Sequence, residues 1–299
     1  MQRSKILRGV FPQIGHKPSM PGKNRKMPRA KKPGTRKTAQ KKGTKRSVSA
    51  RSAVAPTFAA PIPTGTVSPN NAAVITDASG NEHGLGHVYT YDAGDFEHPM
   101  SPHIGEIDGD PMTQTQVHAL GPILNQQKTQ SCVGHGWTLF VTSAPQLTSP
   151  GPDPYRIYHE AQQLDDIAGE EPVYFGTTVR AGAKAMLQDG WITGDYVWAE
   201  DARVLWKYVL TRGPVVLGSD WFQGMNRVDN NGFVALSGPR VGGHCYLCYG
   251  VSASDRAFLC ANSWGKTWGD GGIFLFRFDD VRTLFWRQQM VACSAVESV

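Results

Sequence analysis

Three residues far apart in the sequence have the types and local settings of a thiol-based catalytic site. Cys132 follows a polar turn in LNQQKTQSCVGHGW (124–137), His244 follows two glycines in GGHCYLCYG (242–250), and Asn262 opens NSWGKTW (262–268). A thiol attacks a carbonyl as its thiolate, and an adjacent imidazole takes the proton and later returns it to the leaving group. An asparagine that accepts a hydrogen bond from the imidazole fixes the tautomer needed. These residue types predict nucleophilic catalysis by Cys132, with His244 as base and Asn262 orienting it.

The same segments resemble the motifs of the papain-like cysteine peptidases, in the chain order Cys, His, Asn of that family. Asn-Ser-Trp-Gly, with a second tryptophan four residues after the first, matches the asparagine motif. Gln126 lies six residues before Cys132, which is the family's spacing between oxyanion-hole glutamine and nucleophile. The resemblance covers about residue 122 to the C-terminus, and three motifs in order are stronger than one. It implies a cysteine-type endopeptidase or exopeptidase that needs no cofactor, closest to bacterial or phage-type members.

The resemblance also assigns roles around the nucleophile. Gln126 would donate its side-chain amide to the developing oxyanion together with the Cys132 backbone amide, with Gln127 and Gln130 as nearby alternatives. Trp264 would cover the contact between asparagine and histidine and exclude water. Trp268 would line the leaving-group side of the cleft. The small residues Gly243 and Gly176 suggest an open, uncharged substrate pocket.

Two features depart from the family pattern. The residues after Cys132 are Val-Gly-His-Gly-Trp, where the family has Trp or Thr followed by Ala and an aromatic residue, and Thr129 replaces a cysteine of plant and lysosomal members. No helical inhibitory prodomain is recognisable upstream. Because Thr129 replaces that cysteine, the usual disulfide pattern of the plant and lysosomal members is not expected here.

Some residues offer competing interpretations. His135 lies one helical turn after Cys132, so it is the main rival to His244. Cys245 and Cys248 beside a histidine suggest a metal site, but residues three apart on a strand face opposite sides and cannot share an ion. We therefore expect no metal, and we expect the four cysteines other than Cys132 to be buried free thiols in apolar strands.

The charge is concentrated at the N-terminus. Residues 1–51 contain 17 of the 31 Lys and Arg and none of the 25 Asp and Glu. We expect residues 1–65 to be a disordered basic tail with an Ala/Pro linker, because the segment has too few large apolar side chains to offset its ordering entropy. Residues 1–51 could bind nucleic acid or another polyanion, or be a solubilising, localising or transit tail.

Residues 66–110 form a lead-in extension whose order the sequence leaves open, and residues 111–299 form the peptidase domain. Helices are expected from Cys132, at 153–164 with Asp153 as cap and Pro154 in the first turn, at 177–187 and at 201–211. Strands are expected at 214–222, 232–238, 244–253, 257–264, 272–278 and 290–296. Helices first and strands afterwards predict an α+β fold, and the resemblance implies the papain-like arrangement of a helical lobe and an antiparallel β-lobe around a cleft.

Other functions use the same residues. A catalytically inactive papain-like binding module or a nucleic-acid-associated protein would need none of the catalytic set, whereas acyl transfer to an amine would need all of it. No apolar run is long enough for a membrane span and no secretory signal is recognisable, so we expect a cytoplasmic protein, with a nucleic-acid-associated or virion location as alternatives. The oligomeric state is not readable from the sequence.

Overall fold

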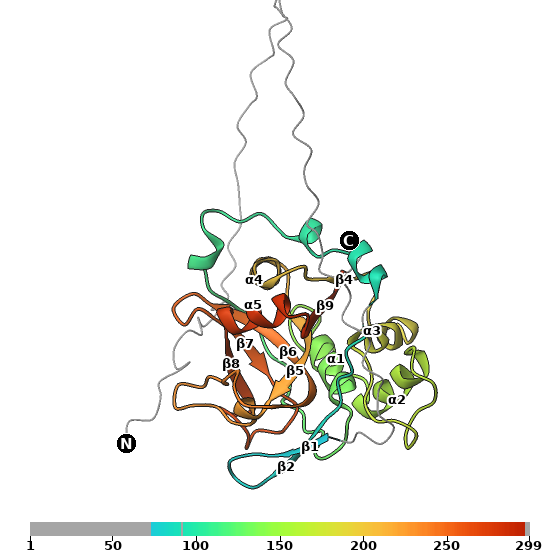
Figure 1. Cartoon of the computed structure of the whole chain (residues 1–299). Helices are drawn as coiled ribbons and strands as arrows, with labels where there is room; N and C mark the ends of the chain where they lie inside the picture. Colours follow the sequence, from blue (N-terminus) through green and yellow to red (C-terminus); the bar gives the residue numbers. More distant parts are fainter. Residues whose placement is uncertain (1–72, 91, 297–299) are drawn as a thin grey trace, which may run out of the picture. The chain divides into compact units, whose positions relative to one another are not determined.

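An antiparallel sheet of seven strands forms the framework of the residues that this computed structural model describes, 73–90 and 92–296 (Figure 1). Its strand order is β4 (Asp195–Trp198), β9 (Met290–Val296), β5 (Val215–Phe222), β6 (Arg240–Ser252), β7 (Ala257–Ala261) and β8 (Ile273–Arg277). The short strand β3 (Gln116–Val117) pairs with β6. Side chains alternate between the two faces of a strand. Along β6, Cys245 and Leu247 therefore pack into one apolar cluster, and Tyr246 and Cys248 into the other.

Helices cover both faces of this sheet. On the face of Cys245 lie α1 (Cys132–Thr142), α2 (Pro154–Leu164) and α3 (Val179–Gln188), and on the face of Tyr246 lie α4 (Ala202–Thr211) and α5 (Phe278–Trp286). The side chains of Asp153, Thr178 and Asp201 accept hydrogen bonds from the first free N–H groups of α2, α3 and α4. Such caps set where each helix begins. The helices expected from the sequence are present within two residues of their expected bounds.

Helix α1 begins at Cys132 although it contains two glycines, which lower helix propensity. Packing explains them. A Cβ on Gly134 would lie 2.0 Å from the carbonyl oxygen of Pro154, and one on Gly136 would lie 2.9 Å from the sulfur of Cys245. The glycines thus let α1 approach both α2 and β6. Ser131 precedes the helix without a side-chain capping bond, because its hydroxyl bonds to Thr129 instead.

Three elements differ from the expectation: one expected strand is absent, and one strand and one helix were not expected. Residues 232–238 form no strand, only a bridge from Phe233 to Leu275. The Asp229 carboxylate accepts hydrogen bonds from the backbone of Asn231 and Phe233 and so holds a turn there. Strand β4 and helix α5 were not expected. Helix α5 begins at the residue directly after β8. Its buried apolar residues Phe278, Val281 and Leu284 follow the apolar run of that strand without a break, so the sequence pattern did not mark a new element.

The structure describes residues 73–90 and 92–110 of the lead-in extension. Strands β1 (Ala73–Thr76) and β2 (Glu82–Leu85) form an antiparallel hairpin, followed by 3-10 turns η1 (Ala93–Glu97), η2 (Ser101–His103) and η3 (Pro111–Thr113); η4 (Gln223–Asn226) follows β5. The basic tail and linker predicted for residues 1–65 lie outside the described residues. Among the described helices, none has the length and apolar character needed to cross a membrane.

Candidate active site

Cys132 lies at the N-terminus of α1 with 0% of its surface exposed. Burial raises the pKa of its thiol to about 12, although hydrogen bonds from the backbone N–H groups of Cys245 and Gly86 favour the thiolate. The partial positive charge of the helix N-terminus acts in the same direction as these N–H groups. In the described state burial wins, so Cys132 is a neutral thiol surrounded by groups that would stabilise its anion.

His244 lies on β6, directly before Cys245, whose backbone N–H faces the Cys132 sulfur. Its Nε2 lies 2.8 Å from Asn262 Oδ1, which also accepts a hydrogen bond from the backbone of Ser263. Because an amide oxygen can only accept, Nε2 carries the proton and Nδ1 does not. Nδ1 of His244 is buried and has no hydrogen-bond partner. The Asn262 contact therefore leaves one ring nitrogen free to take a proton.

Three tryptophans enclose this pair. The Trp264 ring stacks on the His244 ring with centroids 4.5 Å apart and planes 26° apart, and Trp221 meets the same ring edge-on at 5.0 Å. Trp268 packs at a right angle on Trp264 and donates from Nε1 to the carbonyl of Asn226. Burial lowers the pKa of His244 to about 3, with contributions in the same direction from the neighbouring histidines 87, 83 and 135, and the hydrogen bond that the ring donates to Asn262 acts against them. The imidazole is therefore neutral in the described state.

Gln126 is buried beside the nucleophile with every side-chain polar atom bonded. Its Nε2 donates to the carbonyl oxygens of Gly84 at 3.0 Å and Thr129 at 2.7 Å, and its Oε1 accepts from the Ser263 hydroxyl at 2.6 Å. The backbone of Gln126 also donates to the carbonyl of Ser263. Ser263, between Asn262 and Trp264, thus ties the glutamine to the segment that carries the asparagine.

The peptide carbonyl held by Gln126 belongs to a segment of this same chain, residues 82–88, which we call the cover segment. The carbonyl oxygen of Gly84 also accepts from Trp264 Nε1 at 3.3 Å, and its N–H donates to the carbonyl of Gln127 at 2.9 Å. Further along, the N–H of His87 donates to the carbonyl of Gly243 at 3.0 Å. Residues 86–88 exchange two backbone hydrogen bonds, both 2.9 Å, with Thr177. The segment lies over Cys132 as an extended peptide held by its backbone.

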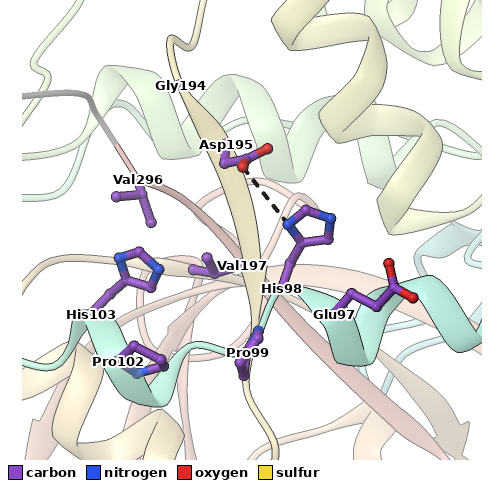
Figure 2. Close-up of a pocket in the computed structure, with 9 residues that line it drawn as sticks. All are labelled: Glu97, His98, Pro99, Pro102, His103, Gly194, Asp195, Val197 and Val296. Atoms are coloured by element: carbon purple, nitrogen blue, oxygen red, sulfur yellow. Dashed lines mark ion pairs between the residues drawn. The ribbon is translucent and has the colours of Figure 1, made fainter.

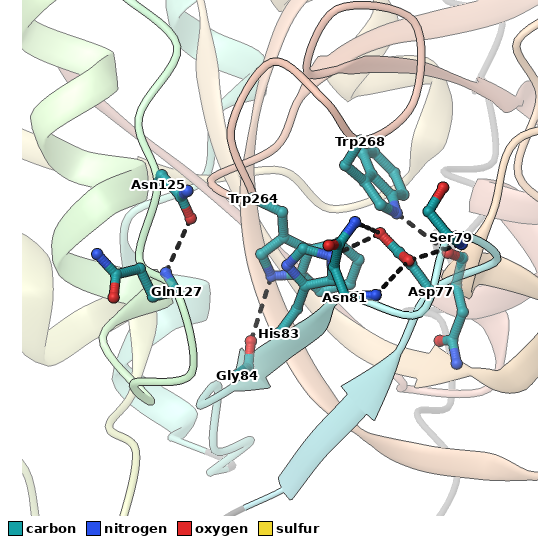
Figure 3. A network of polar contacts seen from close by, with 10 residues as sticks. Asp77, Ser79, Asn81, His83, Gly84, Asn125, Gln127, Trp264 and Trp268 are labelled. Atoms are coloured by element: carbon teal, nitrogen blue, oxygen red, sulfur yellow. Dashed lines mark hydrogen bonds and ion pairs between the residues drawn. The ribbon is translucent and has the colours of Figure 1, made fainter.

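Two histidines of the cover segment are buried against the site. His83 stacks on Trp264 at 4.9 Å, and its Nε2 lies 2.8 Å from the carboxylate of Asp77 in the hairpin turn (Figure 3). Burial raises the pKa of that carboxyl, but hydrogen bonds from His83, Asn81 and Ser79 outweigh it and lower the pKa to about 2. His87 is buried, and neither of its ring nitrogens has a partner. Burial, and the charge of Arg240, lower the pKa of His87 to about 3.

Gly176 and Gly243 both lie against the backbone of the cover segment. A Cβ on Gly176 would lie 2.5 Å from the carbonyl oxygen of Gly86, and one on Gly243 would lie 2.2 Å from that of His87. The two residues expected to border an open pocket therefore border the backbone of the cover segment in the described state.

The competing residues occupy other positions. The His135 ring is buried against Tyr155, and its Nδ1 lies 2.9 Å from the carbonyl of Ser131 on the preceding turn. Cys245 and Cys248 lie in different apolar clusters, on opposite faces of the sheet. Within residues 73–90 and 92–296 no group of His, Cys, Asp or Glu side chains is arranged to hold a metal ion.

The arrangement of helices and strands is similar to that in a solved structure of a cysteine protease. Xylellain, a cysteine protease from Xylella fastidiosa, matches 72% of this chain and 97% of its own at 16% identity, with a TM-score of 0.53. The described body has the papain-like fold. Digestive procathepsin L 3 from Tenebrio molitor larval midgut matches 63% of this chain and 71% of its own at 12% identity, with a TM-score of 0.48. No family model and no curated protein matches the sequence.

A separate open hollow lies at the edge of the papain-like body, with a volume of about 620 Å³. It is lined by η1 and η2 residues, the start of β4 and the end of β9, and His98 Nδ1 lies 3.7 Å from the Asp195 carboxylate across it (Figure 2). Both of these side chains are largely exposed. The hollow shares no residue with the Cys132 site.

Sequence reasoning missed the cover segment and Ser263. The segment His-Gly-Leu-Gly-His (83–87) carries a visible signal, two glycines and two histidines placed symmetrically about one leucine. Ser263 belongs to the Asn-Ser-Trp-Gly motif, but nothing in that motif indicated its hydrogen bond to Gln126.

Proposed function

We propose that this protein is a cysteine peptidase in which Cys132 is the nucleophile, His244 the base, Asn262 the residue that orients the base, and Gln126 an oxyanion donor. The observation that carries the proposal is one peptide segment held at both groups: Gln126 Nε2 donates to the carbonyl of Gly84, and the N–H of Gly86 faces the buried sulfur of Cys132. The site thus holds a peptide group next to a thiol. The hydrogen bond from His244 to Asn262 under Trp264 supports it.

The chemistry begins when the cover segment leaves. Water then reaches the site, which removes the burial that raises the pKa of Cys132 and lowers that of His244. The proton passes from the sulfur to the free Nδ1 of His244, and the thiolate attacks a substrate carbonyl. Gln126 Nε2 and the Cys132 backbone N–H receive the developing oxyanion. The imidazolium protonates the leaving amine, and water then hydrolyses the acyl-enzyme by the reverse use of the same imidazole.

The cover segment itself is bound in a geometry that blocks this reaction. A productive peptide needs one carbonyl whose carbon faces the nucleophile and whose oxygen faces the oxyanion donor. Here Gln126 binds the carbonyl of Gly84, whereas the sulfur of Cys132 receives the N–H of Gly86 two residues further along. The two catalytic groups therefore contact different peptide groups, and the segment acts as a blocking peptide.

The path of the cover segment favours an endopeptidase. Chain continues from both ends of the segment, towards the hairpin turn at Asp77 on one side and towards Thr90 on the other. A groove that accommodates a peptide continuing in both directions has no wall that would require a free terminus.

The test uses the full chain with the Leu85→Ala substitution, which removes a buried side chain of the cover segment and destabilises the closed state by about 2–5 kcal/mol. This variant should hydrolyse a peptide library and react with a cysteine-directed epoxide at Cys132. Adding Cys132→Ala should abolish both, whereas adding Cys248→Ala, a buried thiol on the other face of the sheet, should not. Full activity after loss of Cys132, or no reaction in a folded Leu85→Ala chain, would sink the proposal.

A further inference from the structure

The cover segment carries a glycine on each side of Leu85, and both stand where the groove leaves no room for a side chain. A Cβ on Gly84 would lie 1.9 Å from the carbonyl oxygen of Thr129, and one on Gly86 would lie 1.8 Å from that of Gln130. Both obstacles are backbone atoms, which cannot rotate away as a side chain could. Neither glycine has a φ in the left-handed region. Space, and not backbone conformation, therefore requires glycine at these two positions.

The loop that restricts the groove cannot move back without disturbing the site. Thr129 is bonded three times to Gln126: its carbonyl accepts from the Gln126 side chain, and its N–H and hydroxyl donate to the Gln126 carbonyl. The Gln130 side chain is buried and donates to the carbonyl of Lys128 within the same loop. The loop leads directly into Cys132, so widening the groove would displace both the nucleophile and the oxyanion donor.

The residue between the glycines has the opposite environment. Leu85 is 1% exposed and packs directly on Gly242 of β6, where its Cδ1 lies 2.8 Å from the position of a Cβ. Successive side chains of an extended peptide alternate in direction. Side chains on either side of Leu85 would therefore face the Cys132 loop while Leu85 faces the apolar core.

We propose that the groove beside Cys132 selects extended peptide segments with glycine on both sides of one apolar residue, as in Gly84-Leu85-Gly86. The substrate class is polypeptides that present such a glycine-flanked residue, and this assignment of substrates rests on the proposed peptidase function. The cover segment is the intramolecular competitor for the same groove, which explains why its sequence satisfies the same restriction.

The experiment measures binding of fluorescent heptapeptides to the full-length Leu85→Ala chain by anisotropy, and in parallel the hydrolysis of a peptide library. The reference peptide is Glu-His-Gly-Leu-Gly-His-Val, the sequence of residues 82–88. Peptides with Gly84→Ala or Gly86→Ala should bind at least about tenfold more weakly, because the added methyl overpacks against fixed backbone. A Leu85→Ala peptide should lose a similar factor. The matched control is the Glu82→Gln peptide, which loses only an exposed ion pair with Lys128 and should bind about as well as the reference.

In the full chain itself, Gly86→Ala should open the site and speed alkylation of Cys132, whereas Gly94→Ala, whose new methyl would meet only the Asp92 carboxylate at 3.2 Å, should not. Alanine peptides that bind as tightly as the reference would overturn the inference, even if Gly86→Ala fails to fold. A library in which cleaved segments show no enrichment of flanking glycine would overturn it as well. If peptides bind with the expected preference but Cys132 never reacts, the groove specificity stands and the peptidase proposal fails.

Discussion

Acid should open the site, because the closed state buries histidines in the neutral form. His87 has a pKa of about 3 when enclosed, against 6.5 for an ordinary histidine. Below pH 6.5 the released segment therefore takes up a proton that the closed segment does not. Stability of the closed state is fully present above pH 6.5 and is lost as the pH falls towards 3, at about 1.4 kcal/mol per pH unit.

The size of the effect between pH 7 and pH 5 follows from these two pKa values. The closed state loses about 2 kcal/mol through His87 alone, which raises the open population about 25-fold. Arg240 acts in the same direction, since its charge also disfavours the imidazolium in the closed state. The lowered pKa of His244 adds to the effect wherever opening lets that ring become charged.

The assay is the rate of Cys132 alkylation in the full chain, divided at each pH by the rate in the Leu85→Ala chain. This division removes the pH dependence of the thiol chemistry itself. The ratio should rise by about one order of magnitude or more between pH 7 and pH 5. In a His87→Leu chain the rise should shrink, whereas a His159→Leu chain, which loses an exposed histidine of α2, should behave as the parent. A flat ratio, or one that rises towards alkaline pH, would refute the reasoning.

The remaining predictions concern single residues and the basic tail. Gln126→Ala in the Leu85→Ala background should lower kcat by about 10²–10³-fold, since it removes one oxyanion donor; an unchanged kcat would contradict that role. His244→Ala should remove nearly all activity and Asn262→Ala a smaller share, while His135→Ala should keep most of kcat/KM; a His135→Ala enzyme as inactive as His244→Ala would reverse the ranking. We propose that the tail binds DNA or RNA, so deleting residues 1–65 should abolish this binding and leave Tm unchanged. The logarithm of the binding constant should fall by about 0.9 per tenfold rise in salt concentration for each phosphate contacted. Full-length protein that retains no nucleic acid at ~50 mM salt would contradict the proposal.

Local chemistry in the sequence was enough to predict most helices. The cap predicted at Asp153 is present, and Thr178 and Asp201 cap α3 and α4 in the same way, so the start of each helix and its cause lie within a few residues of each other. The β-rich half was harder to predict. Residues 232–238 have strand-like composition, yet the Asp229 carboxylate accepts the N–H of Phe233 and holds a turn there, and that competition depends on a residue outside the apolar run.

The candidate site shows a similar division. Cys132, His244 and Asn262 were predicted because each proposed role requires one side-chain chemistry; in the structure His244 bonds to Asn262, and the backbone of Cys245 faces the Cys132 sulfur. Gln126 was predicted from its spacing to Cys132 together with the neighbouring Asn125, and the structure adds the serine that holds it, Ser263. The carbonyl of Gly84, which accepts from the Gln126 side chain, could not be predicted, because every residue type has a backbone carbonyl oxygen. Only the space available restricts this position to glycine.

The position of the cover segment over the site was not predicted from the sequence, for a physical reason. It is bound through backbone N–H and C=O groups, which every residue except proline shares, and through the absence of side chains at Gly84 and Gly86. Across the groove, Gly176 and Gly243 also leave space that backbone oxygens of the segment fill. Glycines 176 and 243 were interpreted as signs of an open pocket, although a missing Cβ is equally what the close approach of another chain requires. A glycine in the wall of a groove therefore predicts that another backbone approaches it closely. The approaching segment is best sought among segments that contain glycine themselves, as the cover segment does with Gly86 next to Gly176.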